Sequence, residues 1–501
     1  GRAGRSCPGS PRRAGRPACM RLSRTTCGKL DYDPAKLETG IVHLGIGAFH
    51  RAHMADFTDE VLRGGDLRWG ILGASLRSTG TRDALAPQDF LYTIAESDET
   101  GERCRVIAAC TGILVAPEDP EALIEAMCQP AVKIVSLTVT EKGYCHDPAT
   151  GALNENHPDI LHDLASLDRP RSAPGFLVAA LKRRRERNLP PFTVLCCDNL
   201  PANGHTVRKV VTRMAALVDP ALGTFVADNV SFPSTMLDRI VPATTDADRA
   251  RISATTGLED AWPVVTERYN SWVVEDDFPQ GRPAWTATFV KDVAPFELMK
   301  IRLLNGAHSS MAYLGYLAGH ETIADCMADP HLAHFVSHLM NAEVTSTLPQ
   351  PPGADIGAYK RALLARFRNP SLRHRCWQIA MDGSQKLPQR LLDTIRERLK
   401  AGQPIDALAL GVAAWMRYVT GIDEKAQPID VRDPLRDELR RRADAAHGGS
   451  ARLASSLLGV EQVFGGDLPA EPVFVTAVTD ALEGLMRNGS RRTLEAFAAS
   501  H

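Results

Sequence analysis

The spacing of apolar residues changes near Pro295, and this change limits the folds that the chain can adopt. Before Pro295, short apolar runs are separated by stretches with a helical pattern. The runs that predict buried strands are residues 40–48, Trp69–Leu76, Lys133–Thr140, Phe192–Cys197 and Met236–Val241. Strands that alternate with helices at this spacing predict a largely parallel sheet.

After Pro295 the apolar residues follow the period of a helix instead. Phe474, Val478, Leu482 and Leu485 recur at i, i+4, i+8 and i+11, which makes one amphipathic stripe. Other helical patterns cover Ala312–Ala318, Ala362–Phe367, Leu391–Leu399 and Leu408–Tyr418. The second half is therefore predicted to be a mostly helical domain.

A glycine-rich turn ends the first predicted strand. Gly45-x-Gly47-x-x-His50 is an imperfect dinucleotide fingerprint, because a histidine replaces the third glycine. The turn would bring Gly45, Gly47, Ala48 and Phe49 close to a pyrophosphate, although an ordinary strand–helix turn has the same pattern. We expect an α/β fold, with a Rossmann-type dinucleotide-binding domain over residues 27–290 and a helical substrate or catalytic domain over residues 291–501.

The end of the second predicted strand lacks the acid that usually binds a ribose 2′-hydroxyl in NAD-dependent folds. Ser75 and Arg77 stand there instead. Both side chains can accommodate a 2′-phosphate, which favours NADP, but Arg77 is equally typical of a solvated surface. NAD is the expected coenzyme, and NADP is not excluded.

Polar residues follow two later strands, where ligands of open α/β sheets bind. Glu141 and Lys142 follow the third predicted strand, and Asn199 follows the fourth. Glu141 is expected beside the coenzyme, although ordinary loop polarity explains the pattern as well. Asp238 lies inside an apolar strand and needs a partner, since buried charges are costly. It is also expected near the coenzyme.

The run from Lys300 to His308 combines three groups suited to oxidising an alcohol. Lys300, Asn305 and His308 are spaced at i, i+5 and i+8, and on a helix all three can line one cleft. An amine can act as a base, an amide can polarise a carbonyl, and an imidazole can bind a hydroxyl. The spacing alone is weak evidence, because polar helix residues usually face water.

Composition excludes several classes of function. The formal net charge of −2 provides no basic field for nucleic acid, and no apolar run is long enough to span a membrane. The 11 cysteines form no Cys-x-x-Cys pair, and the 15 histidines show no zinc-site spacing. We expect a cytoplasmic protein without a metal that acts on a small molecule as a monomer or weak oligomer.

The beginning of the chain differs from the rest. Its first 19 residues are rich in Arg, Gly and Pro and contain no acid, so we expect residues 1–26 to form a disordered basic leader. A transit peptide is one interpretation. Translation upstream of a true start at Met20 is the preferred one.

Five segments together resemble the long-chain mannitol dehydrogenase family of polyol and uronate oxidoreductases. They are Ile41–His53, Ser136–Cys145, Cys197–Gly204, Phe232–Pro242 and Lys300–His308. The resemblance covers nearly everything from about Gly40 onward, and five motifs in the right order are specific.

The resemblance implies roles for individual residues. Lys300 would be the general base, Asn199 and Asn305 would flank the reacting oxygen, and His308 would hold substrate hydroxyls. Glu297 would exchange protons with solvent. The family is independent of zinc, which agrees with the absence of metal motifs.

Within the family, the chain looks more similar to the fructuronate reductase (mannonate oxidoreductase) branch than to mannitol 2-dehydrogenase. Lys142 and the segment Arg373–Arg390 carry this similarity. Lys142, Lys386 and Arg390 are then expected to bind the substrate carboxylate. Interconversion of D-fructuronate and D-mannonate is the predicted reaction. Mannitol 2-dehydrogenase or another polyol dehydrogenase is the alternative, and a non-catalytic coenzyme-binding protein is a distant one.

Overall fold

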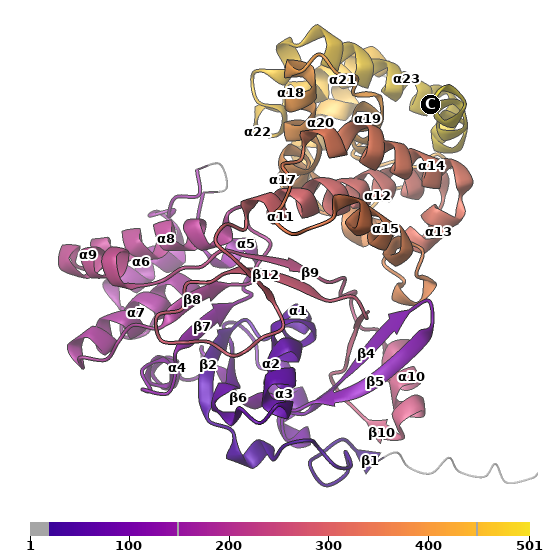
Figure 1. Cartoon of the computed structure of the whole chain (residues 1–501). Coiled ribbons are helices and arrows are strands. Elements are labelled where there is room, and N and C mark those ends of the chain that lie inside the picture. Colours follow the sequence, from indigo (N-terminus) through magenta and orange to yellow (C-terminus); the bar gives the residue numbers. More distant parts are fainter. Residues whose placement is uncertain (1–19, 148–149, 447–448) are drawn as a thin grey trace, which may run out of the picture.

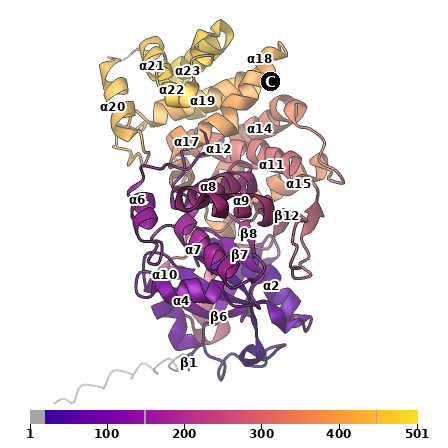
Figure 2. The same ribbon diagram turned by 90° about the vertical axis from the view of Figure 1, so that its left-hand side faces the viewer.

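The computed structural model describes residues 20–147, 150–446 and 449–501. The chain folds into two halves that lie one above the other (Figures 1 and 2). The α/β half runs from β1 (Met20–Arg21) to β13 (Thr288–Val290), and the helical half runs from α11 (Ala294–Met299) to α23 (Pro472–Ser500). The predicted fold class, a Rossmann-type half followed by a helical half, is confirmed.

A five-stranded parallel sheet forms the centre of the α/β half. Its strand order is β6-β3-β2-β7-β8, so the chain builds outward from β2 first to one side and then to the other. This order places a topological switch point at β2, where open α/β sheets bind ligands. The strands are β2 (Thr39–Leu44), β3 (Gly70–Ser75), β6 (Cys110–Val115), β7 (Ile134–Leu137) and β8 (Thr193–Cys196).

Both faces of this sheet are buried, which explains the continuous apolar runs in the sequence. Successive side chains point to opposite faces, so Val42 and Val135 belong to one apolar cluster while Ile41 and Ile134 belong to another. The first cluster includes side chains of α4 (Pro120–Met127), α7 (Ala173–Glu186) and α8 (Asn203–Val218), and the second those of α2 (Met54–Arg63).

Three smaller sheets complete the α/β half. The strand predicted over Met236–Val241 forms β9 (Thr235–Asp238), which pairs antiparallel with β12 (Ser271–Glu275). No strand is predicted between Leu76 and Lys133, yet the structure has β4 (Tyr92–Asp98), β5 (Gly101–Ile107) and β6 there. β5 starts with three exposed residues and has no buried residue before Ile107, so its sequence shows no apolar run. The remaining strands are β10 (Leu258–Glu259) and β11 (Val264–Glu267).

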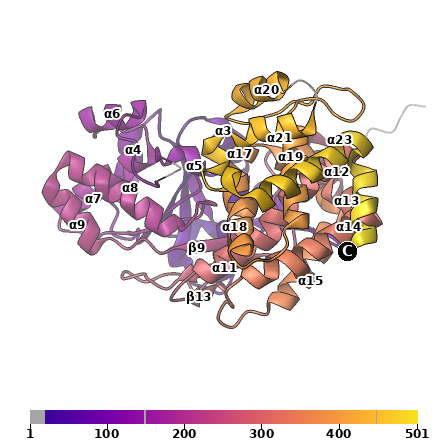
Figure 3. The ribbon, with the colours of Figure 1, turned by 90° about the horizontal axis from the view of Figure 1, so that it is seen from above.

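The other helices of this half are short. They are α1 (Ala48–Ala52), α3 (Gly80–Leu85), α5 (Thr140–Gly143), α6 (Pro158–Ala165), α9 (Pro220–Asn229) and α10 (Asp246–Thr256). Seen from above, α6–α9 lie on one side of the molecule and the helical half on the other (Figure 3).

The helical half has a single large apolar core. The stripe predicted from Phe474 to Leu485 lies on α23 and is fully buried against α19 and its neighbours. The α- and π-helices between α11 and α23 are η4 (a π-helix, Lys300–Asn305), α12 (Gly306–Ala318), α13 (Ile323–Ala328), α14 (Pro330–His338), η5 (a π-helix, Leu339–Val344), α15 (Ile356–Phe367), α16 (Cys376–Ala380), α17 (Gly383–Leu387), η8 (a π-helix, Pro388–Leu392), α18 (Asp393–Lys400), α19 (Asp406–Tyr418), α20 (Arg436–Ala445), α21 (Ser450–Leu458) and α22 (Glu461–Phe464).

The predicted leader is too long at its C-terminal end. Residues 1–19 lie outside the described residues, but Met20 and Arg21 form β1, which pairs with β10. Leu22 is fully buried against Leu91 and Ala108. Residues 20–26 therefore belong to the fold, because a single apolar side chain anchors a segment that has no periodic pattern.

Candidate active site

A cavity of about 450 Å³ lies between the two halves, at the carboxyl ends of the central strands. The α/β half contributes the glycine turn after β2, the residues that follow β7 and β8, and the first three residues of β9, and the helical half contributes α11 and η4. Its lining residues are Gly47, Ala48, Phe49, Thr138, Thr140, Glu141, Cys197, Asp198, Asn199, Leu200, Thr235, Met236, Leu237, Glu297, Lys300 and Ile301. We call this space the lysine cavity.

The glycine turn is held by polar contacts underneath it. Gly45 has a φ of +91°, and a Cβ atom there would lie 2.1 Å from the carbonyl oxygen of Thr138. The Thr138 hydroxyl donates to the carbonyl of Gly45 at 2.6 Å and is 2.8 Å from Nε2 of His43. His50, at the position of the missing third glycine, stacks on His43 with ring centroids 3.4 Å apart. The imperfect fingerprint thus forms a close-packed turn in which one ring packs on another.

A second cavity of about 450 Å³ continues from the lysine cavity toward the end of β3. The two share Gly47, Thr138 and Thr140, and the second is also lined by Gly45, Ser75 and Arg77. We call the pair the coenzyme crevice. A Cβ atom at Gly47 would have no neighbour closer than 3.9 Å, so the crevice is open above the turn. An extended dinucleotide fits a crevice that passes over a glycine turn at the switch point.

Of the residues predicted to bind the coenzyme, only Asp238 does not line this crevice. Both of its carboxylate oxygens accept from Arg366 on α15, at 3.1 and 2.6 Å, and Tyr359 donates to it at 2.7 Å. Asp238 is 1% exposed. The charge in β9 thus has its partner in the other half, and the structure assigns it to the contact between the halves.

Lys300 lines the lysine cavity and donates from Nζ to Oδ1 of Asn199 at 3.0 Å. Burial lowers the pKa of Lys300 to about 8; the negative charge of Asp238 opposes this shift, while the positive charges of Arg390 and Arg366 add to it. An amine with this pKa is able to exchange a proton near neutral pH. Asn199, which follows β8, is therefore in contact with the predicted base.

The expectation that Asn305 and His308 line the same cleft as Lys300 is not met in this conformation. Residues 300–305 form a π-helix, whose wider turn changes the angles expected from an α-helix. Asn305 and His308 are 6% and 5% exposed, and neither lines the lysine cavity. Within the described residues, Nδ2 of Asn305 and Nε2 of His308 have no hydrogen-bond partner. The Asn305 amide and the His308 ring nitrogen are thus buried and able to bind a ligand.

Glu297 also lines the lysine cavity, one helical turn before Lys300. Its carboxylate accepts the backbone N–H of Ala202 at 2.9 and 3.2 Å. Burial raises the pKa of Glu297, and the contacts with Ala202 and Lys300 oppose that rise. A carboxyl group with a raised pKa beside an amine with a lowered pKa is a suitable proton acceptor and donor.

The two cations Lys386 and Arg390 lie close to each other, and Arg390 is also close to Lys300. Both side chains are largely buried. Arg390 donates to the Ser309 hydroxyl at 3.1 Å and approaches the carbonyl of Asn305 at 3.5 Å. Burial lowers the pKa of Lys386 to about 8 and that of Arg390 to about 10. The charge of Glu141, across the interface, acts on both. Lys386 donates from Nζ to the carbonyl oxygens of Ile379 and Met381 at 3.3 and 2.5 Å. Within the described residues, neither cation forms an ion pair with a carboxylate.

Lys142 is placed differently from the sequence prediction. It is exposed on α5 and lines neither part of the coenzyme crevice. The four-residue helix turns Glu141 toward the cavity and Lys142 away from it, because adjacent residues on a helix point in different directions.

Asp198, which is not among the predicted site residues, has a positioning role. Its carboxylate accepts from the N–H groups of Val139 and Thr140, and from the hydroxyl of Tyr144 at 2.6 Å. Burial raises the pKa of Asp198 to about 6. This carboxylate joins the loops that follow β7 and β8, so that Glu141 and Asn199 are held at one edge. The only signal in the sequence was its place directly after a strand.

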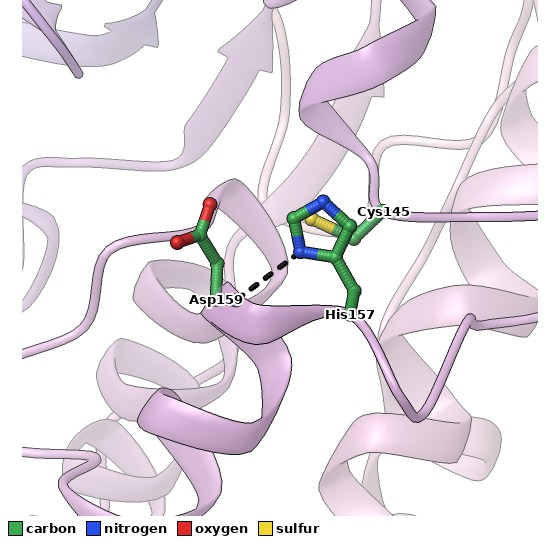
Figure 4. Close-up of side chains that lie close together, drawn as sticks. All are labelled: Cys145, His157 and Asp159. Atoms are coloured by element: carbon green, nitrogen blue, oxygen red, sulfur yellow. Dashed lines mark hydrogen bonds between the residues drawn. The ribbon is translucent and has the colours of Figure 1, made fainter.

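One group of potential metal ligands lies outside the lysine cavity. Among the described residues, Cys145, His157 and Asp159 have ligand atoms within 4.8 Å of one another (Figure 4). The Nδ1 atom of His157 already accepts the backbone N–H of Asp159 at 3.2 Å, as a helix cap. Burial raises the pKa of the Cys145 thiol to about 12, which disfavours the thiolate that a metal requires.

Comparison with known proteins identifies the family. A model of the mannitol dehydrogenase Rossmann domain matches residues 39–287, and a model of the mannitol dehydrogenase C-terminal domain matches residues 292–486. The chain belongs to the mannitol dehydrogenase family. Members of this family are oxidoreductases that act on CH–OH groups, and the resemblance noted in the sequence is confirmed.

The similar family members include proteins named for two different activities. D-mannonate oxidoreductase of Escherichia coli (strain K12) is 46% identical over 93% of this chain and 97% of its own length. Mannitol 2-dehydrogenase of Pyricularia oryzae is 40% identical over 93% and 94%. The structure of Pseudomonas fluorescens mannitol 2-dehydrogenase in a ternary complex with NAD and D-mannitol has a TM-score of 0.89 and 38% identity, covering 96% of this chain and 100% of that one.

The two matched segments meet between residues 287 and 292, just before α11 and Lys300. None of the helices in the described part of the chain is long and apolar enough to cross a membrane.

Proposed function

We propose that this chain is an NAD-dependent oxidoreductase that interconverts D-fructuronate and D-mannonate. NADH, bound in the coenzyme crevice, would supply the hydride that reduces C5 of the keto acid. The glycine turn and the side chains of Ala48, Phe49, Ser75 and Glu141 would hold the dinucleotide, because they line that crevice.

Proton transfer is the task of the residues around Lys300. In the reducing direction, Lys300 would give its proton to the carbonyl oxygen as that oxygen gains negative charge. The amides of Asn199 and Asn305 would stabilise the developing alkoxide as hydrogen-bond donors. Glu297 would return a proton to Lys300 from solvent. In the oxidising direction the same proton leaves the substrate hydroxyl for neutral Lys300.

One observation supports an acid substrate rather than a polyol. Donors on Asn305, His308 and Arg390 are buried without hydrogen-bond partners in the described residues, and each such group costs about 1–3 kcal/mol. Lys386 and Arg390 add two cations at the same place. A ligand with several oxygens and a carboxylate satisfies these groups together, whereas a neutral polyol leaves the cations unpaired.

The substrate proposal predicts a selective effect at Lys386. Lys386→Met keeps the aliphatic stem but loses a charge-assisted bond, so KM for D-fructuronate should rise about 10- to 100-fold. KM for D-fructose should change less than about 2-fold, since fructose has no carboxylate. Initial rates of NADH oxidation at 340 nm with a panel of keto-uronates and ketoses measure both.

Two further variants control this experiment. Lys400→Met makes the same substitution on an exposed part of α18 and should leave both KM values unchanged. Lys142→Met tests the position predicted from the sequence alone. A rise in KM for D-fructuronate equal to that of Lys386→Met would show that Lys142 binds the substrate. D-fructose as the better substrate of the parent enzyme would favour mannitol 2-dehydrogenase, and no turnover of any compound would favour a binding protein.

The pKa of Lys300 predicts opposite pH profiles for the two directions. Oxidation of D-mannonate needs the neutral amine, so its kcat/KM should rise with pH and level off above about 8. Reduction of D-fructuronate needs the ammonium form, so its kcat/KM should fall above the same pH. Profiles measured at constant ionic strength check this, and a rise in both directions would contradict the role of Lys300.

A further inference from the structure

A third cavity, of about 570 Å³, lies beside the part of the coenzyme crevice at the end of β3. Three separate segments surround it: the residues after β3, the residues after β6, and α6 with the loop that leads to α7. Leu76, Arg77, Asp159 and Arg171 line this cavity, and Arg77, Asp159 and Arg171 also line the crevice. We call it the arginine pocket. A ligand in the crevice can therefore extend a group into the pocket.

The arginine pocket carries an excess of positive charge. Arg77, Arg169 and Arg171 line it, and within the described residues no ion pair or side-chain hydrogen bond is formed by their guanidinium groups. Among the residues that line the pocket, one is acidic, namely Asp159. The strand end that usually carries an acid for the ribose 2′-hydroxyl ends in Ser75, Leu76 and Arg77.

The loop that carries two of these arginines is held in place from below. Asp163 on α6 is fully buried and accepts the backbone N–H groups of Arg171 and Ser172 at 2.8 and 2.9 Å. It also accepts the hydroxyl of Ser172 at 2.6 Å. These hydrogen bonds anchor the backbone of Arg171 through main-chain and Ser172 groups, so they do not use the arginine guanidinium groups at the pocket. Oδ1 of Asp163 also lies 3.0 Å from Nδ1 of His162.

We propose that the arginine pocket binds the 2′-phosphate of NADP(H), so that this enzyme accepts NADP(H) as well as NAD(H). A phosphate dianion matches guanidinium groups in charge and in hydrogen-bond geometry. Asp159 repels the phosphate, but its single negative charge is outweighed by the three arginines. When NAD(H) is bound instead, the Asp159 carboxylate can accept a hydrogen bond from the ribose 2′-hydroxyl. This inference rests on the proposed function in one respect, namely that the coenzyme is a nicotinamide dinucleotide.

Binding of two nucleotide fragments tests this without any turnover. Adenosine 2′,5′-bisphosphate and AMP differ only by the 2′-phosphate, and calorimetric titration of the whole chain gives both dissociation constants. We expect the bisphosphate to bind at least about 10-fold tighter at low salt, with the advantage falling as salt rises. AMP binding as tightly as, or tighter than, the bisphosphate would overturn the proposal.

Single substitutions assign the effect to the pocket. Arg171→Ala and Arg77→Ala should each weaken the bisphosphate about 10-fold and AMP less than about 2-fold. Asp159→Asn should strengthen the bisphosphate. Arg452→Ala, at an exposed position of α21, is the matched control and should leave both constants unchanged.

Folding and function remain separable in this test. Retained AMP binding shows that a variant is folded, and equal losses for both ligands would contradict a 2′-phosphate site. The parent protein gives a second measurement, the ratio of NADPH to NADH affinity by nicotinamide fluorescence, which should not fall below about one-tenth. Absence of uronate turnover would overturn the proposed function but not these binding constants.

Discussion

Replacing Lys300 by alanine is expected to reduce kcat about 10²- to 10⁴-fold in both directions, because a positioned general acid–base group contributes that much. Coenzyme affinity should remain within about 3-fold of the parent value, since the cavity at the end of β3 does not include Lys300. Turnover with D-fructuronate or D-mannonate measures the first effect, and nicotinamide fluorescence measures the second.

Chemical rescue distinguishes a lost base from a disturbed fold. Small primary amines in solution should restore part of the activity of Lys300→Ala, with the rescue following the pKa of the added amine. Lys400→Ala, a substitution on the exposed end of α18, should keep the parent activity. A Lys300→Ala enzyme with near-parental rates across pH would show that another group transfers the proton.

Removing Arg366 is expected to destabilise the protein by about 3–5 kcal/mol, since it leaves buried carboxylates without a partner. Arg366 on α15 donates to Glu267 at 2.8 and 2.7 Å as well as to Asp238, and its guanidinium lies 4.1 Å from the ring centre of Tyr269. Asp238 and Glu267 are 1% and 2% exposed. Urea unfolding of Arg366→Met, followed by circular dichroism, measures the loss in the free energy of unfolding.

The same helix provides a control for this measurement. Arg361 is largely exposed, and its guanidinium lies 3.9 Å from Asp355. Arg361→Met should therefore change the free energy of unfolding by less than about 1 kcal/mol. Combining Arg366→Met with Asp238→Asn and Glu267→Gln should recover most of the stability, because no buried charge remains unpaired. Equal losses in the free energy of unfolding for Arg361→Met and Arg366→Met would show that the buried ion pairs stabilise the protein no more than an exposed one.

Local patterns were sufficient to predict much of the fold. The apolar runs at β2, β3, β7, β8 and β9 were found from the sequence, since a strand buried on both faces needs apolar side chains on both. The stripe on α23 was found because its period is that of a helix. The hairpin of β4 and β5 was missed, because the buried β4 contains Glu96 and Ser97 and the start of β5 is exposed and charged.

For the active site, residue types were predictable and their contacts were not. The motifs identified Lys300, Asn199 and Glu297, and these three do line one cavity. The same reasoning put Lys142 at the substrate and Asp238 at the coenzyme, whereas one faces solvent and the other joins the two halves. Arg169 and Arg171 are not predictable as pocket residues, since nothing in a loop sequence shows which cavity the loop faces.

By itself, the sequence determined the two classes of secondary structure, the glycine turn, the family and the residues able to do acid–base chemistry. These features depend on neighbours within a few positions along the chain, where periodicity and steric rules act. Only the tertiary structure decided which charges meet. Lys300 contacts Asn199 across 101 positions and Arg366 contacts Asp238 across 128, and burial in such contacts sets the pKa of Lys300 near 8.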